Sequence, residues 1–591
     1  MPARGTRLAR AAPGHDPRPA VNGARPAVAH LTACPVAVPA HTTCGLLEVP
    51  ERRDTPGGAS AGASGRTIKV GYAVRRSTAP DRKPDPVVYM SGGPAASSLH
   101  LTGFVGDLFP DRDVITVEQR GGRWSQPRLS CPESVRVMLD RLRAGHAEVG
   151  AADVGAAADT CRGRLSEQGV DLRGYTTREI VADLAQLRAV LGYASWNLFG
   201  VSYSTRVMLD LAAADPAGTR AVVLDSFLPE SVDWYGDADR NLADAIHSLG
   251  AAEPFEALVT RLNRSPARVP ITDPLLGTEF TARLSGDDVA TVLAGALHHA
   301  KTVAVAPALI HALAAGHDGP LRPFANAVGD ALASYEFGLY HAIQCQDEPV
   351  FPERSRLFTV HSDRAVCDTW KLPVSAPARS STDAPALVLG GRHDHTTPAR
   401  TSRPAADLLP NATFVEFAGV GHSVFLAEDT HCGRQTIAAF VARPTSWSRP
   451  CVPDRAALPS VGPGELVVTA APYRLGRTPW LGAPAALFAL MALAQFVTGA
   501  LRGRALTAFA GLSGLAALGL TARSLYDQVR VNDTALAVGV PAEVTVYVWP
   551  AMASVAFTLV ALVVHRKKPW FHVISAVAGG GFLIWWFAWF L

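Results

Sequence analysis

Four long apolar segments at the C-terminal end constrain this chain more than any other feature of its sequence. They cover approximately residues 480–501, 505–522, 544–564 and 570–591. Each holds roughly 18 to 22 residues, and a helix of that length crosses a hydrocarbon core of about 30 Å. Because ionisable residues are almost confined to the gaps, helices buried in a water-soluble core are the weaker alternative. We expect four transmembrane helices and a lipid bilayer around them.

The charges in the gaps predict the orientation of these segments. The first gap carries Arg502 and Arg504, and the third carries Arg566, Lys567 and Lys568, whereas the middle gap is mixed in charge. Short loops rich in Lys and Arg stay in the cytoplasm. The middle gap, the C-terminus and the long region before the first segment are therefore expected outside the cytoplasm, in a multi-pass protein of the cell membrane.

The cysteines agree with an oxidising compartment. They fall into four pairs of near neighbours in sequence, Cys34/Cys44, Cys131/Cys161, Cys345/Cys367 and Cys432/Cys451. An even number in local pairs is typical of disulfide bonds, although spacing alone leaves the connectivity open, and free buried thiols are the alternative. No CxxC motif or Cys/His cluster indicates a metal site.

Residues 1–30 leave the route of export open. An exported domain is expected to follow a signal with an apolar core, but this stretch is rich in Arg, Pro and Gly and has no such core. Either the protein starts elsewhere than at Met1, or the first transmembrane segment directs export, or the topology is inverted. We otherwise expect a flexible tail here.

Composition excludes two classes of protein. Hydrophobic residues make up 48% and charged residues 18% of the chain, which excludes a disordered polyelectrolyte. The 55 Lys and Arg residues balance 52 Asp and Glu residues, and no basic stripe interleaved with aromatic residues occurs. Nucleic acid is therefore not an expected partner.

Short apolar runs alternate with helical patterns in the region before the apolar segments. Strands are expected at 87–90, 113–117, 196–199, 221–224, 386–389 and 413–417, with helices at 177–191 and 205–214. Strands that alternate with helices predict a doubly wound, mostly parallel α/β sheet.

The predicted nucleophile is Ser202, which lies between an expected strand and an expected helix. A Gly-x-Ser turn in this setting lets the serine hydroxyl protrude at the carboxyl edge of a sheet. The full pattern is Gly-x-Ser-x-Gly, and Ser204 takes its last place. Serine is small enough to fit there.

Acid and base candidates follow Ser202 in the order that such a site requires. Asp394 follows an expected strand, and His422 stands in a glycine-flanked turn after the next one. His422 would take the serine proton and return it to the leaving group, while Asp394 would fix the imidazole tautomer. His393, His395 and Asp407 are rivals by proximity.

Acyl transfer also needs hydrogen-bond donors for the oxyanion. The backbone N–H of Tyr203, directly after the nucleophile, is one expected donor. The other is expected from the Gly92-Gly93 turn, because glycine allows a close approach to the substrate carbonyl. The alternative is that this turn only connects a strand to a helix.

These motifs carry a family resemblance. The segments YMSGGPA, DVITVEQRGGRWSQPRLSCPE, LRAVLGYASWNLFGVSYSTRVMLDLAAADP, GGRHDHTTP and GVGH resemble the α/β-hydrolase peptidases that include prolyl aminopeptidases and actinobacterial tripeptidyl aminopeptidases. The resemblance covers roughly residues 31–455. It implies an extracytoplasmic serine exopeptidase that acts on free N-termini without a cofactor. It also supports the Ser202, Asp394 and His422 assignment, and the cysteine pairs resemble those of secreted members.

The chain departs from the family pattern beside the expected oxyanion site. Ser91 and Ala95 stand where the family has His and Gly, and Glu118 stands where the family has Asp before Gln-Arg-Gly. The apolar segments from residue 480 onward are not part of the ordinary soluble members.

The stretch between Ser202 and Asp394 is longer than the remaining strands require, and its excess is largely helical in pattern. We expect a cap that selects substrates. In an aminopeptidase, nearby carboxylates are expected to face the substrate ammonium, because a buried amine without a partner is costly. Asp347, Glu348 and Glu230 are the candidates, and solvated surface acids are the alternative.

The expected organisation divides the chain into six parts. These are a tail (1–30), the first part of the α/β core (31–228), a helical cap (229–375), the second part of the core (376–455), a linker (456–479) and the membrane domain (480–591). The predicted function is a membrane-anchored serine aminopeptidase outside the cytoplasm. One alternative is an esterase or amidase for small or membrane-partitioning substrates, and a further one is a non-catalytic binding or transporter-accessory protein. The sequence names no protein partner.

Overall fold

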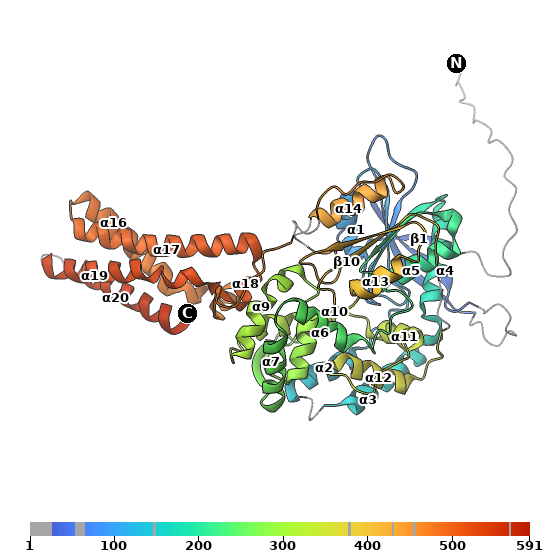
Figure 1. Cartoon of the computed structure of the whole chain (residues 1–591), viewed down its shortest axis with the longest axis horizontal. Helices are drawn as coiled ribbons and strands as arrows, with labels where there is room; N and C mark the ends of the chain where they lie inside the picture. Colours follow the sequence, from blue (N-terminus) through green and yellow to red (C-terminus); the bar gives the residue numbers. More distant parts are fainter. Residues whose placement is uncertain are drawn as a thin grey trace, which may run out of the picture.

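The computed structural model describes residues 27–53, 65–145, 149–375, 380–427, 431–452, 457–565 and 569–591 (Figure 1). Of the expected tail, only residues 27–30 belong to this part, and they lead into a strand that begins at Val28. Arg566, Lys567 and Lys568, on which part of the predicted orientation rests, lie outside the described residues.

A nine-stranded sheet lies at the centre of the region before the apolar helices. Its strands are β1 (Val28–Thr32), β2 (Thr42–Pro50), β3 (Thr67–Arg75), β4 (Val87–Met90), β5 (Val114–Val117), β6 (Trp196–Val201), β7 (Thr219–Asp225), β10 (Ala386–Gly391) and β11 (Ala412–Phe417). Their order is β1-β2-β3-β5-β4-β6-β7-β10-β11. The pairs from β1 to β5 in this order are antiparallel and the others are parallel, which confirms the predicted α/β sheet.

The order of the strands reverses at β4, which lies between β5 and β6. Met90, the last residue of β4, is in register with Gly200 of β6. In open α/β sheets, ligands bind outside the carboxyl ends of the strands where the order reverses. The turns that follow β4 and β6 therefore meet at the edge of the sheet where a site is expected.

Helices cover both faces of the sheet. One face packs against α4 (Thr177–Leu191), α5 (Ser204–Ala214) and α13 (Ala399–Ala406), and the other against α1 (Thr102–Leu108) and α14 (His431–Ala442). Successive strand residues point to opposite faces of the sheet. Val88 packs with the first group of helices and Tyr89 with the second. This burial on both sides explains why the central strands are continuous apolar runs.

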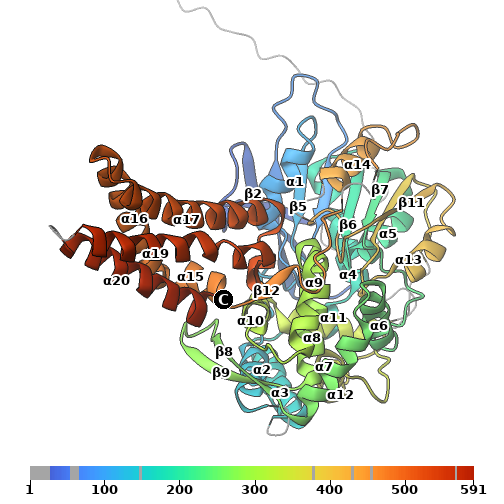
Figure 2. The same ribbon diagram turned by 60° about the vertical axis from the view of Figure 1, so that its left-hand side comes forward.

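A cap follows β7. It consists of α6 (Ala238–Ser248), α7 (Ala252–Arg264), β8 (Ala267–Thr272), β9 (Glu279–Leu284), α8 (Gly286–Ala296), α9 (Ala300–Ala314), α10 (Leu321–Ser334), α11 (Phe337–Asp347) and α12 (Phe358–Trp370). The hairpin β8–β9 adds a strand pair to the expected helices. Two helices from before the nucleophile pack against the cap: α2 (Pro132–Ala144) contacts β9, and α3 (Ala151–Glu167) contacts α12, as Figure 2 shows.

All eight cysteines form disulfide bonds between the neighbours that the sequence pairs. The bonds are Cys34–Cys44, Cys131–Cys161, Cys345–Cys367 and Cys432–Cys451. Cys345–Cys367 joins α11 to α12 within the cap.

Four helices at the C-terminal end are long and apolar enough to cross a membrane, which confirms the prediction. These apolar helices run over Pro479–Leu501, Ala505–Asn532, Ala542–Val564 and Pro569–Phe590, and their α-helical parts are α16 (Ala483–Leu501), α17 (Ala505–Asn532), α19 (Val548–Val564) and α20 (Pro569–Trp585). Helix α17 continues well beyond the predicted end at residue 522. Glycine allows α16 and α17 to pack closely, because a Cβ on Gly511 would collide with the backbone at Phe496.

The structure describes the expected linker from residue 457 onward. It contains β12 (Leu466–Val468) and α15 (Ala471–Arg477), and β12 pairs with β13 (Gly539–Pro541) from the connection between the second and third apolar helices. The short helix α18 (Ala535–Val538) packs on α9 of the cap, and Figure 1 labels both helices. The apolar helices are thus joined to the cap by packed elements.

Candidate active site

The turn after β6 holds Ser202 in a strained conformation. Its φ is +58°, a region that residues with a side chain rarely adopt, and such strain is typical of a nucleophile turn. A Cβ on Gly200 would lie 2.6 Å from the Ser204 carbonyl oxygen, so glycine is required before the turn. The Ser204 hydroxyl accepts a hydrogen bond from the Val201 N–H (2.8 Å) and donates one to the Met90 carbonyl (2.7 Å). Serine in the last place of the motif therefore ties the turn to β4.

The loops after β10 and β11 bring Asp394 and His422 together. The His422 Nδ1 atom lies 2.9 Å from Asp394 Oδ2 and 3.1 Å from Oδ1. Asp394 also accepts hydrogen bonds from the N–H groups of Thr396 (2.8 Å) and Thr397 (2.9 Å) and from the Thr397 hydroxyl (2.7 Å). The carboxylate is thus fixed on the side of the imidazole where an orienting acid must stand.

The surroundings of this pair shift the pKa of both members. Burial by itself raises the pKa of Asp394, but the adjacent His422 and the bonds from Thr397 outweigh burial and lower it. Burial alone would lower the pKa of His422, but the Asp394 carboxylate, its hydrogen bond and the charge of Asp225 together raise it above the ordinary value of 6.5. Asp394 is therefore ionised, and His422 is a stronger base than free imidazole.

Asp225 is a second carboxylate of the site, and our sequence analysis missed it. This last residue of β7 is fully buried and accepts hydrogen bonds from the N–H groups of Val424 (2.9 Å) and Phe425 (2.7 Å). Burial raises the pKa of Asp225 to about 6. Asp225 holds the loop after His422 without a hydrogen bond to the His422 ring. The sequence marks Asp225 merely as an acid at the end of an apolar strand.

The rivals of Asp394 and His422 have other surroundings. The His393 Nδ1 atom lies 2.8 Å from the Ser248 hydroxyl in the cap, and Asp407 is exposed. His395 is buried, and its ring stacks on that of His298 at 5.0 Å between centroids. Burial lowers the pKa of His395 to about 4, so this ring is neutral at physiological pH.

The Gly92-Gly93 turn lies against the nucleophile turn. A Cβ on Gly92 would come within 2.5 Å of the Val201 carbonyl oxygen and 3.3 Å of the Tyr203 nitrogen. Gly93 has a φ of +108°, which favours glycine. The structure therefore brings the expected oxyanion residues to one place.

The side chain of Gln119 braces this turn. Its Nε2 donates hydrogen bonds to the carbonyls of Ser91 (3.0 Å) and Gly92 (2.9 Å), and its Oε1 accepts one from the Ala95 N–H (2.9 Å). The neighbouring Glu118 accepts hydrogen bonds from the segment that follows, and burial raises its pKa. The motif that carried the family resemblance thus shapes the expected oxyanion turn.

Two of the carboxylates expected to bind a substrate amine share one arginine. Arg206 of α5 forms an ion pair with Glu348, and its Nε lies 3.5 Å from Glu230. Burial raises the pKa of both acids, and it raises that of the nearby Asp210 to about 6. One guanidinium thus faces an excess of carboxyl groups.

Asp347, the third expected acid, is turned toward α4. It accepts hydrogen bonds from the Thr177 N–H (3.1 Å) and hydroxyl (2.6 Å), and the same hydroxyl lies 2.6 Å from the Tyr203 hydroxyl. Asp347 therefore supports the residue that follows the nucleophile.

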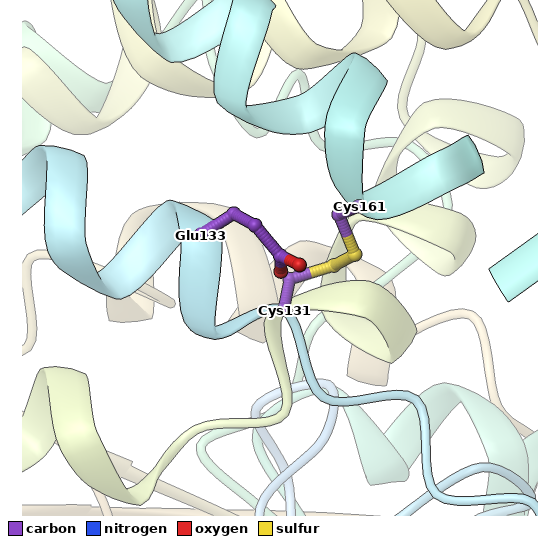
Figure 3. A group of neighbouring side chains, drawn as sticks. All are labelled: Cys131, Glu133 and Cys161. Carbon is purple, nitrogen blue, oxygen red and sulfur yellow. A yellow bond between two sulfur atoms is a disulfide. The ribbon is translucent and has the colours of Figure 1, made fainter. Parts of the chain in front are cut away.

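Among the described residues, one group of side chains has the spacing of a metal site. It consists of Cys131, Glu133 and Cys161 (Figure 3). The two sulfur atoms are bonded to each other, so neither is a thiolate that would bind a metal. Glu133 accepts hydrogen bonds from Arg164 at 2.8 and 3.0 Å. The group is a disulfide beside an ion pair.

Two known families match parts of the chain. Residues 85–272, which include Ser202, match the family described as alpha/beta hydrolase fold. Residues 357–449, which include Asp394 and His422, match the family described as TAP-like protein.

Individual relatives include serine peptidases. The serine protease Hip1 of Mycobacterium tuberculosis is 25% identical over 477 residues, which cover 69% of this chain and 86% of Hip1. A proline iminopeptidase of Xanthomonas citri is 34% identical over 131 residues, or 21% of this chain and 37% of the relative. A solved proline iminopeptidase from Mycobacterium smegmatis is 17% identical, with 64% of this chain and 96% of that one covered and a TM-score of 0.35. The sheet order, the family matches and the first two relatives show that the chain is a serine hydrolase of the α/β-hydrolase fold, similar to TAP-like proteins and serine peptidases.

Proposed function

We propose that this protein is a membrane-anchored serine aminopeptidase that releases single residues or short peptides from the N-termini of substrates outside the cytoplasm. One observation carries the proposal. The hydrogen-bonded Asp394–His422 pair follows two neighbouring parallel strands, at the same sheet edge as the strained Ser202 turn. The similarity to a serine protease and to proline iminopeptidases supports a peptide substrate.

The reaction proceeds through an acyl-enzyme. The Ser202 hydroxyl attacks the peptide carbonyl while His422 takes its proton, and His422 then gives that proton to the leaving amine. Water, deprotonated by His422, attacks the acyl-enzyme and releases the N-terminal fragment. The N–H of Tyr203 and the Gly92-Gly93 turn stabilise the oxyanion in both steps.

The carboxylates around Arg206 are the proposed contact for the substrate ammonium. Glu230 and Glu348 share a single positive charge, so a bound ammonium would relieve their mutual repulsion. Arg206 lies in the first turn of α5, four residues after Ser202 in the sequence. Asp347 contributes charge but is held by Thr177.

The four disulfide bonds support placement of the hydrolase region outside the cytoplasm, because reduced thiols prevail inside. The positive gap at Arg502 and Arg504 supports the same orientation. Cysteine accessibility and reporter fusions at the two ends of α17 test it.

The test of activity uses the full chain in detergent, with chromogenic peptide anilides that carry free or blocked N-termini and with nitrophenyl esters. We expect cleavage of the free-amine peptides, its loss in Ser202→Ala, and full activity in Ser446→Ala, which changes an exposed serine. Glu230→Gln should raise KM for free-amine peptides and leave ester cleavage unchanged, with the exposed Glu167→Gln as its control.

Other outcomes lead to other functions. Ester cleavage without anilide cleavage would make the protein an esterase. No turnover of any substrate by folded, disulfide-bonded protein would contradict the proposal and favour a binding role.

A further inference from the structure

We propose that His298 of the cap is a positioning residue for the Asp394–His422 pair, held in place by the apolar C-terminal helices through α9. This inference rests on the proposed function, because it assigns His422 the role of base. His298 lies in the short connection between α8 and α9 and is far from the other site residues in sequence.

The His298 ring lies between two imidazoles of the site. Its centroid is 5.0 Å from that of His422, with the planes inclined by 40°, and 5.0 Å from that of His395, with the planes nearly parallel at 16°. The cap thus places an aromatic ring beside the ring of His422.

A hydrogen bond connects His298 to the acid. Its Nε2 lies 2.9 Å from the Thr396 hydroxyl, and the Thr396 N–H donates to Asp394 Oδ1 at 2.8 Å. His298 therefore fixes the loop that holds the carboxylate against His422.

The cap backbone also touches the residue before His422. A Cβ on Gly421 would collide with the Leu297 carbonyl oxygen and would lie 3.1 Å from the His298 carbonyl oxygen. Leu297 is buried in the cap core, so this segment has little freedom to retreat. The contact requires glycine at position 421. It fixes the position of the cap relative to the loop that carries His422.

The apolar helices and their connections hold the start of α9. The Asn532 side chain, at the end of α17, donates a hydrogen bond to the Lys301 carbonyl (2.8 Å), and Lys301 forms an ion pair with Asp533 (3.2 Å). The Val461 N–H donates to the Ala304 carbonyl at 2.8 Å. His298 is less than one turn before Lys301, so its position depends on these contacts.

His298 must be neutral when His422 becomes charged. The titratable groups that face it are His422, His395, Asp394 and His299. Burial, His422 and His395 lower the pKa of His298 well below its ordinary value. The ring therefore adds no second positive charge beside the imidazolium of His422.

The test measures how fast a fluorophosphonate labels Ser202 in the full chain at saturating reagent as a function of pH. His298→Phe keeps a ring but loses the bond to Thr396, and we expect labelling to slow about tenfold with unchanged reagent affinity. The pH midpoint should fall, because a loosened Asp394 raises the pKa of His422 less. His298→Gln retains a group at the Nε2 position and should restore rate and midpoint.

Two further variants complete the test. Thr396→Val should reproduce the effect of His298→Phe, and the double variant should be no worse than either. His317→Gln, which changes an exposed histidine after the far end of α9, should leave both quantities unchanged. If His298→Phe labels with the original rate and midpoint, or if the two effects add, the inference is wrong. Failure of the unaltered protein to label would instead contradict the proposed function.

Discussion

The charges around His422 decide the pH range of activity. Because its pKa lies above 6.5 and the base must be neutral, kcat/KM should rise with pH through a midpoint above 6.5. Nitrophenyl ester hydrolysis measures this without titration of a substrate amine. Asp394→Asn should move the midpoint down and lower kcat by roughly 10⁴-fold, as loss of the orienting acid does in serine triads. A midpoint that Asp394→Asn leaves in place would contradict the pairing.

Asp225 should affect stability in a pH-dependent way. Its carboxyl has a folded-state pKa of about 6, above its ordinary value of 3.8, so the folded state favours the protonated acid. Its contribution to stability is greatest below pH 3.8 and falls as the pH rises through 6. In Asp225→Asn this decline should disappear. The variant should also lose about 1–3 kcal/mol, because one amide oxygen replaces two acceptors for buried N–H groups.

Thermal melting between pH 4 and 8, followed by tryptophan fluorescence, checks this expectation. Asp407→Asn changes an exposed acid and serves as the control. An Asp225→Asn variant that keeps the pH dependence of the unaltered protein would show that another group causes it.

At the scale of elements, the sequence predicted those parts of the site that depend on one strand and the turn that follows it. The turn at Ser202 and the loops at Asp394 and His422 follow apolar strands, and parallel strands bring their ends to one edge. His298 and Asp225 could not be found in this way. His298 approaches His422 only because the cap folds back over the sheet, and Asp225 has the pattern of an ordinary strand end.

The oxyanion turn after β4 depends on one side chain from the loop that follows β5. In Gln119→Glu a carboxylate replaces the amide that donates to the carbonyls of Ser91 and Gly92, so the turn should lose both bonds and be repelled. We expect kcat to fall by roughly 10²-fold, comparable to the loss of one oxyanion donor, with little change in KM. Steady-state kinetics on esters measure both, with the exposed Gln168→Glu as control. An unchanged kcat would show that this turn does not stabilise the oxyanion.

At the scale of the whole molecule, hydropathy predicted the four apolar helices but not how they meet the cap. Their length and composition are properties of continuous segments. The pairing of β12 with β13 and the contact of Asn532 with Lys301 join parts far apart in the chain. The sequence therefore predicted only a linker at 456–479, whereas in the structure Val461 and Leu466 pack into the cap core.

The apolar helices should influence catalysis through this contact. Asn532→Ala removes the hydrogen bond to Lys301 and should slow phosphonate labelling of Ser202 severalfold, while membrane insertion stays intact. Asn411→Ala loses a comparable bond, to the Asp383 carbonyl at 2.7 Å, before β11 and should leave labelling unchanged. Equal rates in the two variants and in the unaltered protein would show that the helices only anchor the enzyme.

The most direct test of the account is to locate the covalent adduct of a fluorophosphonate in the full-length protein by mass spectrometry. The account predicts modification of Ser202 in protein with four intact disulfide bonds. It also predicts loss of the adduct in His422→Ala. An adduct on another serine, or no adduct on folded protein, would contradict the assignment of Ser202 as the nucleophile.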